Sequence, residues 1–384
     1  MIPYGRQDIS ETDIEAVVAT LRSDWLTQGP AVPRFEQMVA AYCGVRYAVA
    51  VANATAALHL ACLALGLGPG KRLWTSPNTF VASANCGRYC GAAVDFVDID
   101  PVSYNLSPAA LADRLQQAEA NDTLPDVLVP VHFAGQSCDM QAIAALARPR
   151  GIAIIEDASH AIGGHYQGRP IGCCEFSDCA VFSFHPVKII TSGEGGMILT
   201  NREDLYQQLV RLRSHGITRD PACMEGPSEG DWYYQQIELG FNYRMTDIQA
   251  ALGASQMTRI DDFVRQRREW VTAYRTALDG QPLQLPDPSN DQASAWHLFV
   301  VQVQADGQRQ RVFNAMRSAG IGVNVHYIPV HLQPYYRRLG FRPGDFPVAE
   351  RYYRHAITLP LYPGLTCQDF RQVVDNMIAI FEKG

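Results

Sequence analysis

Lysine is scarce in this chain. Of its 384 residues, 32 are lysine or arginine, yet only Lys71, Lys188 and Lys383 are lysines. Acidic residues outnumber basic ones, which leaves a formal net charge of −7 at neutral pH. We therefore expect no broad basic surface, and hence neither nucleic acid nor an anionic membrane as a partner.

Spacings typical of metal or haem sites are also lacking. The ten cysteines form no CxxC pair, and the ten histidines include no HExxH motif. We therefore expect no metal site, and scattered free thiols are typical of a reducing compartment, here the cytoplasm. Residues 1–10 show no cationic stretch followed by an apolar core, so no secretory signal is expected.

One apolar stretch is nearly long enough to span a membrane. Residues 47–68 approach the ~20 residues that a bilayer requires. Asn53, Thr55 and His59 interrupt this stretch, and a strand-type run at 47–51 gives way to a helical run at Thr55. We predict a buried strand, turn and helix here rather than a membrane span.

Strand-type and helical runs alternate from residue 47 to about residue 200. Strands are predicted at residues 47–51, 72–76, 93–97, 126–131, 152–156, 179–184 and 197–200. Helical runs lie between many of them, at residues 55–65, 79–90, 107–118 and 140–148. This alternation is typical of an α/β fold with a mostly parallel sheet flanked by helices. Ligands of such folds bind beyond the carboxyl ends of the strands, so functional residues are expected just after each strand.

The remaining segments predict a second, smaller domain. A long helical stretch at 246–278 is followed by a proline-rich linker, a strand near 296–303, a helix near 310–319 and a strand near 322–327. We therefore divide the chain into a large domain with an N-terminal arm, residues 1–245, and a small α+β domain, residues 246–384.

Lys188 stands in a different context from the other two lysines. It follows an apolar strand and has Val187, Ile189 and Ile190 as neighbours. An ammonium in apolar surroundings loses its proton readily and can then attack a carbonyl, which an arginine cannot do. The local context alone fits a nucleophilic lysine and a surface lysine after a strand equally well.

Possible partners for pyridoxal phosphate (PLP) follow neighbouring predicted strands. The apolar run at 152–155 ends in Glu156 and Asp157, and an acid there could keep the pyridine nitrogen protonated. An Asp after a strand is, however, often only a helix cap. The turn at 53–57 offers a hydroxyl and small residues at a helix start, and Ser183 adds another hydroxyl, as phosphate binding requires.

Four ordered segments resemble the signatures of nucleotide-sugar aminotransferases of the DegT/DnrJ/StrS type. They are VANATAALHLA at 51–61, IIEDASHAIGG at 154–164, FSFHPVKIITSGEGG at 182–196 and LGFNYRMTDIQAALGASQ at 239–256. The resemblance spans essentially the whole chain and implies the fold type I of PLP-dependent enzymes.

The resemblance implies catalytic roles for two residues. Lys188 would bind PLP as a Schiff base and move a proton between cofactor and sugar, and Asp157 would pair with the pyridine nitrogen. The other implied cofactor contacts are Ala54, Thr55, Phe80, His160, Ser183 and Asn242. His160 takes a position near the ring that is Gln in many relatives, and Asn242 would reach the phosphate of the other subunit, so a homodimer is implied. Related sugar dehydratases carry His in place of the lysine, so Lys188 favours transamination.

A closer resemblance, to family members of pseudaminic acid synthesis, is carried by IPYGRQDI, SDWLTQGP, VNVHYIPVHLQPYY and ITLPLYPG. It implies amination of C4 of a UDP-linked 4-keto-sugar with L-glutamate as donor. The implied contacts with the sugar nucleotide are Tyr4, Trp25, Leu26, Thr27, His326 and Tyr327. Dimer-interface packing explains these six residues equally well, and Trp25 departs from some relatives, which carry a polar residue there. Two alternatives remain open: a transaminase for another UDP- or dTDP-linked keto-sugar, and a PLP-binding regulatory protein without turnover.

Overall fold

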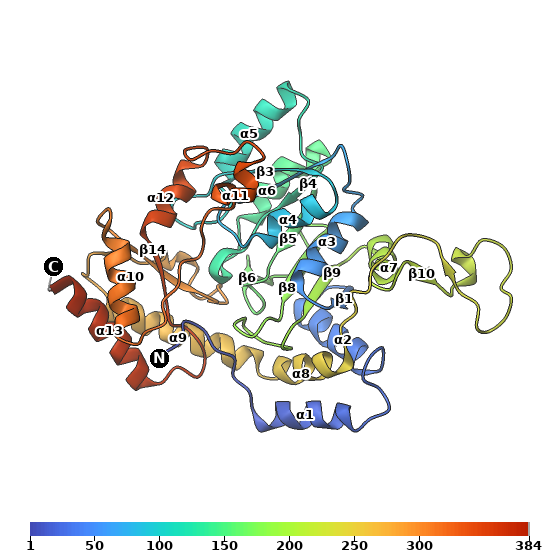
Figure 1. Ribbon diagram of the computed structural model, residues 1–384, viewed down its shortest axis with the longest axis horizontal. Coiled ribbons are helices and arrows are strands. Elements are labelled where there is room, and N and C mark those ends of the chain that lie inside the picture. Colours follow the sequence, from blue (N-terminus) through green and yellow to red (C-terminus); the bar gives the residue numbers. More distant parts are fainter. Residues whose placement is uncertain (383–384) are drawn as a thin grey trace.

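The computed structural model describes residues 1–382, so Lys383 lies outside the described part of the chain. Its centre is a seven-stranded sheet with the order β1-β9-β8-β5-β4-β2-β3 (Figure 1). The strands are β1 Tyr47–Val51, β2 Arg72–Thr75, β3 Ala93–Phe96, β4 Val127–Val129, β5 Ala153–Asp157, β8 Cys179–Ser183 and β9 Gly196–Thr200. Only β9 runs against its neighbours, which confirms the predicted α/β fold with a mostly parallel sheet.

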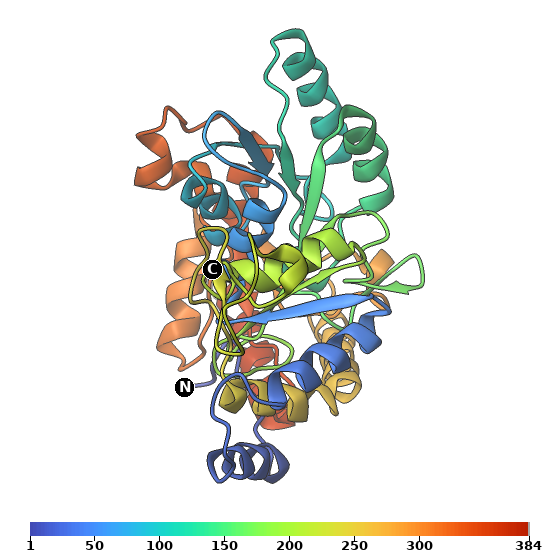
Figure 2. The same cartoon turned by 90° about the vertical axis from the view of Figure 1, so that its right-hand side faces the viewer.

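Helices cover both faces of this sheet. They are α1 Glu11–Leu21, α2 Ala31–Cys43, α3 Ala54–Ala64, α4 Ala82–Tyr89, α5 Pro108–Ala120, α6 Met140–Ala147, α7 Glu203–Leu212, α8 Asp247–Met257 and α9 Ile260–Ala277. One apolar core joins the sheet to Leu58 and Leu60 of α3, and a second joins it to Phe35 of α2 and Val264 of α9. In both views α1 lies at one end of the molecule and α5 at the opposite end (Figures 1 and 2).

The apolar stretch at 47–68 forms β1 and α3, as predicted. Asn53 ends the strand segment and caps α3, because its Oδ1 accepts a hydrogen bond from the Ala56 N–H at 2.9 Å. Both elements are largely buried, and both contribute residues to the first of these apolar cores. No helix of residues 1–382 is long and apolar enough to cross a bilayer.

A second, three-stranded antiparallel sheet lies in the C-terminal part. It contains β12 Leu283–Gln284, β13 Phe299–Val303 and β14 Ala356–Leu359. The accompanying helices are α10 Gln308–Ser318, α11 Pro334–Arg337, α12 Pro347–His355 and α13 Cys367–Glu382. This part has its own apolar core, built around Trp296 and Phe299.

Two predictions for this part are wrong. The stretch at 246–278 is not one helix, because Thr258 and Arg259 separate α8 from α9. The stretch at 322–327 forms no strand; Asn324 makes only one isolated bridge, to Thr358. Since α8 packs against α1 and α2, the division of the chain at 245/246 remains a proposal.

The remaining elements are short. Two-residue strands form the pairs β6 His165–Tyr166 with β7 Arg169–Pro170, and β10 Ile217–Thr218 with β11 Gln235–Gln236. Single 3₁₀ turns are η1 Phe133–Gly135, η2 Arg148–Arg150, η3 Pro221–Cys223, η4 Pro288–Asn290 and η5 Val330–Leu332. The segment 217–236, which we call the arm, projects from the body of the molecule at the right of Figure 1.

Candidate active site

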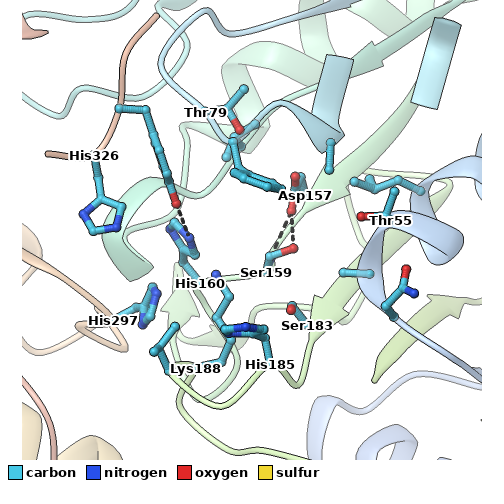
Figure 3. Close-up of a pocket in the computed structure, with 18 of the residues that line it drawn as sticks. Thr55, Thr79, Asp157, Ser159, His160, Ser183, His185, Lys188, His297 and His326 are labelled. Carbon is cyan, nitrogen blue, oxygen red and sulfur yellow. Dashed lines mark hydrogen bonds between the residues drawn. The ribbon is translucent and has the colours of Figure 1, made fainter. Parts of the chain in front are cut away.

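A cavity of about 910 Å³ lies at the carboxyl ends of the central strands. Asp157 is the last residue of β5 and Ser183 the last of β8, and both line the cavity. The opposite wall comes from the C-terminal part, through His297 and residues 324–327 (Figure 3). The position is the one expected for a ligand site in an open α/β sheet, and the volume suits a small organic ligand.

Lys188 lines the floor of this cavity. The chain turns back after β8, and the Lys188 N–H donates to the His185 carbonyl at 2.9 Å. The side chain is half-buried, and its accessible part borders the cavity. Burial lowers the pKa of Lys188 to about 8, although Asp157 acts in the opposite direction. About a fifth of the amine is therefore neutral at about pH 7.4, compared with about 0.1% of an unperturbed lysine, and this neutral form can attack a carbonyl.

Asp157 is held rigidly at the end of β5. Its backbone N–H donates to the Pro130 carbonyl, and its own carbonyl accepts from the His132 N–H. One carboxylate oxygen accepts from the Ser83 hydroxyl at 2.6 Å, and the other from the Ser159 hydroxyl at 2.6 Å. The Ser159 N–H also donates to this second oxygen, at 3.1 Å. A free lone pair therefore remains on the oxygen that Ser83 contacts, and the carboxylate can still accept a proton donor from the cavity.

Glu156, the other acid at this strand end, points away from the cavity. Strand alternation turns it to the opposite side of the sheet from Asp157. There its carboxylate is buried and bonded to Ser177 Oγ at 2.5 Å and to His132 Nε2 at 2.7 Å. Of the two adjacent acids, the structure thus places only Asp157 at the cavity.

The start of α3 forms a polar corner of the cavity. Ala54 and Thr55 occupy its first turn, where backbone N–H groups have no partner within the helix. Ser183 lies in the same wall (Figure 3). Gly196 of β9 allows this arrangement, since a Cβ there would lie 2.5 Å from the Asn53 carbonyl carbon. Helix-start amides next to hydroxyl groups are suited to a phosphate.

Aromatic side chains form the remaining walls. Phe80 leaves 58% of its surface exposed although it is large and apolar, and it borders the cavity. His160 is buried and contacts Tyr327, with 3.1 Å between Nε2 and Oη. An exposed ring of this kind is unlike a core residue and offers a surface for stacking a flat ligand.

The structure brings most, but not all, of the predicted site residues together. Those that line the cavity are Tyr4, Ala54, Thr55, Phe80, Asp157, His160, Ser183, Lys188, His326 and Tyr327. Trp25, Leu26 and Thr27 lie outside it, and so does the exposed Asn242. For these four residues, contact with the substrate or with the cofactor of a second subunit stays a prediction.

Sequence reasoning missed several residues of the site. His297 and Asn324 line the cavity, and Ser83 and Ser159 hold Asp157. Ser159 could have been found, because it lies two residues after Asp157 in the same motif. Ser83 is 74 residues away from Asp157 in sequence, and no spacing signals that contact.

The side chains of this cavity fit PLP. A partly neutral amine can bind its aldehyde, a fixed carboxylate can pair with its pyridine nitrogen, and the start of α3 can hold its phosphate. No group of His, Cys, Asp and Glu side chains that could hold a metal ion occurs among residues 1–382.

Comparison with known proteins agrees with this chemistry. The model of the DegT/DnrJ/EryC1/StrS aminotransferase family matches residues 7–378. Spore coat polysaccharide biosynthesis protein SpsC of Bacillus subtilis is 40% identical, over 97% of this chain and 95% of its own length. UDP-4-amino-4,6-dideoxy-N-acetyl-beta-L-altrosamine transaminase of Campylobacter jejuni is 34% identical, over 100% of this chain and 98% of its own length.

Solved structures of similar proteins cover the whole chain. Helicobacter pylori PseC, an aminotransferase involved in pseudoaminic acid biosynthesis, is 26% identical with a TM-score of 0.90, and all of both chains is covered. The PLP form of the sugar aminotransferase Spr1654 from Streptococcus pneumoniae, described as putative, is 28% identical with a TM-score of 0.90. That match covers 100% of this chain and 99% of that chain.

Proposed function

Because this chain belongs to the DegT/DnrJ/EryC1/StrS aminotransferase family, and is therefore a PLP-dependent sugar aminotransferase, we propose a specific reaction for it. The amino group of L-glutamate is transferred to C4 of a UDP-linked 4-keto-6-deoxy-N-acetylhexosamine. The products are UDP-4-amino-4,6-dideoxy-N-acetyl-β-L-altrosamine and 2-oxoglutarate. Full-length similarity to the transaminase of Campylobacter jejuni and to PseC supports this choice of sugar.

The observation that carries the proposal is the pairing of Lys188 with Asp157 in one cavity. Bound PLP supplies an aldehyde that amines can join and a ring that takes up electrons from a breaking C–H bond. We assign to Asp157 the task of keeping the pyridine nitrogen protonated. The start of α3 and Ser183 hold the phosphate, and Phe80 and His160 border the ring.

Lys188 has two tasks in this proposal. Its Nζ holds the cofactor in the resting enzyme. Once the amino donor has taken its place, the neutral Nζ accepts the proton from the α-carbon of glutamate and later delivers one to C4 of the sugar. The lowered pKa of this amine suits both steps, because an acid–base group works best when its pKa lies near the working pH.

We further propose a cytoplasmic homodimer in which each subunit completes the site of the other. Trp232 in the arm leaves 73% of its surface exposed, and Leu239, in the segment 237–242 at the base of the arm, leaves 80% exposed. Large apolar side chains that are exposed in this way are typical of protein interfaces. Asn242 lies at the base of the arm, bridged to Ser214 and exposed, where a second subunit could use it. The ten free cysteines fit a reducing compartment.

A substrate screen tests the reaction. Purified enzyme is mixed with L-glutamate and with UDP- or dTDP-linked keto-sugars, and released 2-oxoglutarate is measured together with the mass of the sugar product. We expect turnover with the UDP-linked 4-keto-sugar and none with Lys188→Ala or Lys188→Arg. Turnover with a dTDP-sugar alone would refute the sugar assignment, and steady-state activity of either variant would refute the role of Lys188.

A mixing experiment tests the shared sites. Lys188→Ala and Asn242→Ala chains are each expected to be nearly inactive alone. After unfolding and refolding together, half of the dimers are mixed and one site in each mixed dimer is intact, so about a quarter of the wild-type activity should return. No recovery would place Asn242 in the site of its own subunit, and full activity of Asn242→Ala alone would contradict its role altogether.

A further inference from the structure

Both ring nitrogens of His160 are engaged in hydrogen bonds. The backbone N–H of Ala134 lies 3.3 Å from Nδ1, and Tyr327 Oη lies 3.1 Å from Nε2. Figure 3 shows the second of these contacts at the cavity wall, beside Lys188 and His297. Which partner donates in each hydrogen bond decides which ring nitrogen of His160 carries the proton and where the Tyr327 hydroxyl proton points.

Ala134 is held in an unusual conformation that presents its N–H to His160. It has a φ of 59°, a left-handed region that costs a non-glycine residue about 1 kcal/mol or more. Its carbonyl accepts from the His297 N–H at 2.8 Å and from the Leu298 N–H at 3.3 Å. The Phe133 carbonyl, which belongs to the same peptide group as the Ala134 N–H, accepts from the Gln136 N–H at 3.0 Å. The peptide groups on both sides of Ala134 are thus held, and its N–H stays directed at the imidazole.

A peptide N–H can only donate, so Nδ1 of His160 must carry a lone pair. Burial lowers the pKa of His160 well below its ordinary value, and the nearby Lys188 and His326 act in the same direction. The ring is therefore neutral and has a single proton, which must reside on Nε2. That proton is donated to Tyr327 Oη.

The hydroxyl of Tyr327 consequently accepts from His160 and keeps its own proton for another partner. Burial raises the pKa of Tyr327, so the phenol stays protonated. Within residues 1–382 its hydroxyl has no other hydrogen-bond partner, and the residue lines the cavity. We propose that Tyr327 is a dedicated hydrogen-bond donor to an oxygen of the bound ligand, and that Ala134 and His160 are positioning residues that direct its proton into the cavity.

The ligand atom has a definite chemistry. It is an anionic or strongly accepting oxygen, either the phenolic oxygen of the cofactor or a carboxylate or carbonyl oxygen of a substrate; naming these ligands rests on the proposed function. Lys188 is the only lysine or arginine among the described residues that line the cavity. Apart from Lys188, a negative oxygen bound there therefore depends on neutral donors such as this hydroxyl.

Nitrogen NMR of the cofactor-free protein tests the proton order without any reaction. Histidine is labelled with ¹⁵N, and the signals of His160 are assigned by their loss in His160→Gln. At about pH 6.5, where an ordinary histidine is half protonated, we expect a neutral ring with its proton on Nε2. A proton on Nδ1, or a cationic ring at this pH, would overturn the proposal.

Two substitutions at residue 160 form a matched pair. In His160→Gln the amide oxygen can accept from Ala134 and the amide nitrogen can donate to Tyr327, so the order is kept. His160→Leu removes both contacts, and Tyr327→Phe removes the donor itself. Thermal melting and cofactor binding of each variant identify any that fails to fold.

The half-reaction with L-glutamate, followed by absorbance, measures the effect. We expect kcat/KM to fall about ten- to a hundredfold in Tyr327→Phe, the loss typical of a hydrogen bond to a charged acceptor. His160→Leu should fall in the same direction, and His160→Gln should stay within about threefold of wild type. An equal loss in the Gln and Leu variants would refute the proton order.

The Tyr327→Phe variant also locates the acceptor. A shifted pH dependence of the cofactor absorbance in the resting enzyme would assign the bond to the cofactor's phenolic oxygen. An unchanged resting spectrum with a raised KM for glutamate or sugar would assign it to a substrate oxygen. If Tyr327→Phe changes neither the resting spectrum nor KM, the proposal is refuted. Failure of every keto-sugar to react would refute only the proposed sugar, because the half-reaction with glutamate and the NMR experiment do not involve the sugar.

Discussion

The low pKa of Lys188 predicts that one amine of this chain reacts at a pH where ordinary lysines are protonated. Burial lowers that pKa to about 8, compared with ~10.4 for an unperturbed lysine. At pH 8 about half of Lys188 is neutral, compared with about 0.4% of an unperturbed lysine. Charge state alone therefore favours Lys188 by about a hundredfold at that pH.

Pulse labelling of the cofactor-free protein measures this difference. A small amine-reactive reagent is applied briefly from about pH 6 to about pH 11, and modified peptides are quantified by mass spectrometry. Lys71, which is exposed in the turn before β2, is the control in the same molecule. Because burial slows the reagent, the midpoint of the pH dependence, rather than its amplitude, reports the ionisation of Lys188.

The neighbouring Asp157 allows the same experiment to test a second prediction, the direction in which the pKa of Lys188 shifts. Asp157 raises the pKa of Lys188 against the larger effect of burial, so removing its charge in Asp157→Asn should move the midpoint to still lower pH. A midpoint near that of Lys71 in the wild-type protein would refute the reasoning that burial frees this amine. A midpoint that rises in Asp157→Asn would refute the electrostatic link between the two residues.

Three further substitutions test other parts of the site. In the holoenzyme, Asp157→Asn should leave PLP bound but lower kcat about tenfold or more, and an unchanged kcat would remove the residue from the mechanism. Gly196→Ala forces a Cβ against the start of α3 and should weaken PLP binding about tenfold in an absorbance titration. Gly68→Ala, which meets nothing within 4 Å, is its control, and equal affinities in the two variants would contradict the steric argument. Glu156→Ala leaves Nε2 of the buried His132 without its hydrogen-bond partner and should lower the free energy of unfolding in urea by about 2 kcal/mol. A loss below about 1 kcal/mol would show that the pair is dispensable.

The parallel sheet could be predicted because its strands are buried on both faces and read as continuous apolar runs. All seven predicted runs coincide with strands of the central sheet. The strand order and the reversed direction of β9 could not be predicted, because neither leaves a local pattern in the sequence. The failed strand at 322–327 shows the same limit: apolar alternation is present, but only Asn324 finds a strand partner.

The chemistry of the site followed from sequence where a residue type was rare or stood at a strand end. Lys188 was noticeable because lysine is scarce, and Asp157 because it ends an apolar run. The contacts that orient these groups could not be predicted. Ser83 reaches Asp157 from α4, and Ala134 reaches His160 from a 3₁₀ turn, so both contacts depend on tertiary packing.

A buried arginine holds the segment that carries His297 in the wall of the cavity opposite the central sheet. Arg267 of α9 is almost fully buried, and its Nη1 lies within 3.3 Å of the Trp296, His297 and Leu361 carbonyls. A guanidinium that binds three carbonyls fixes the chain segment that carries His297, and the His297 N–H in turn holds Ala134. The same helix packs on the large sheet through Phe263 and Val264. A change at Arg267 should therefore loosen the Ala134 peptide and disturb the proton order at His160, which the nitrogen NMR of the His160 ring would detect.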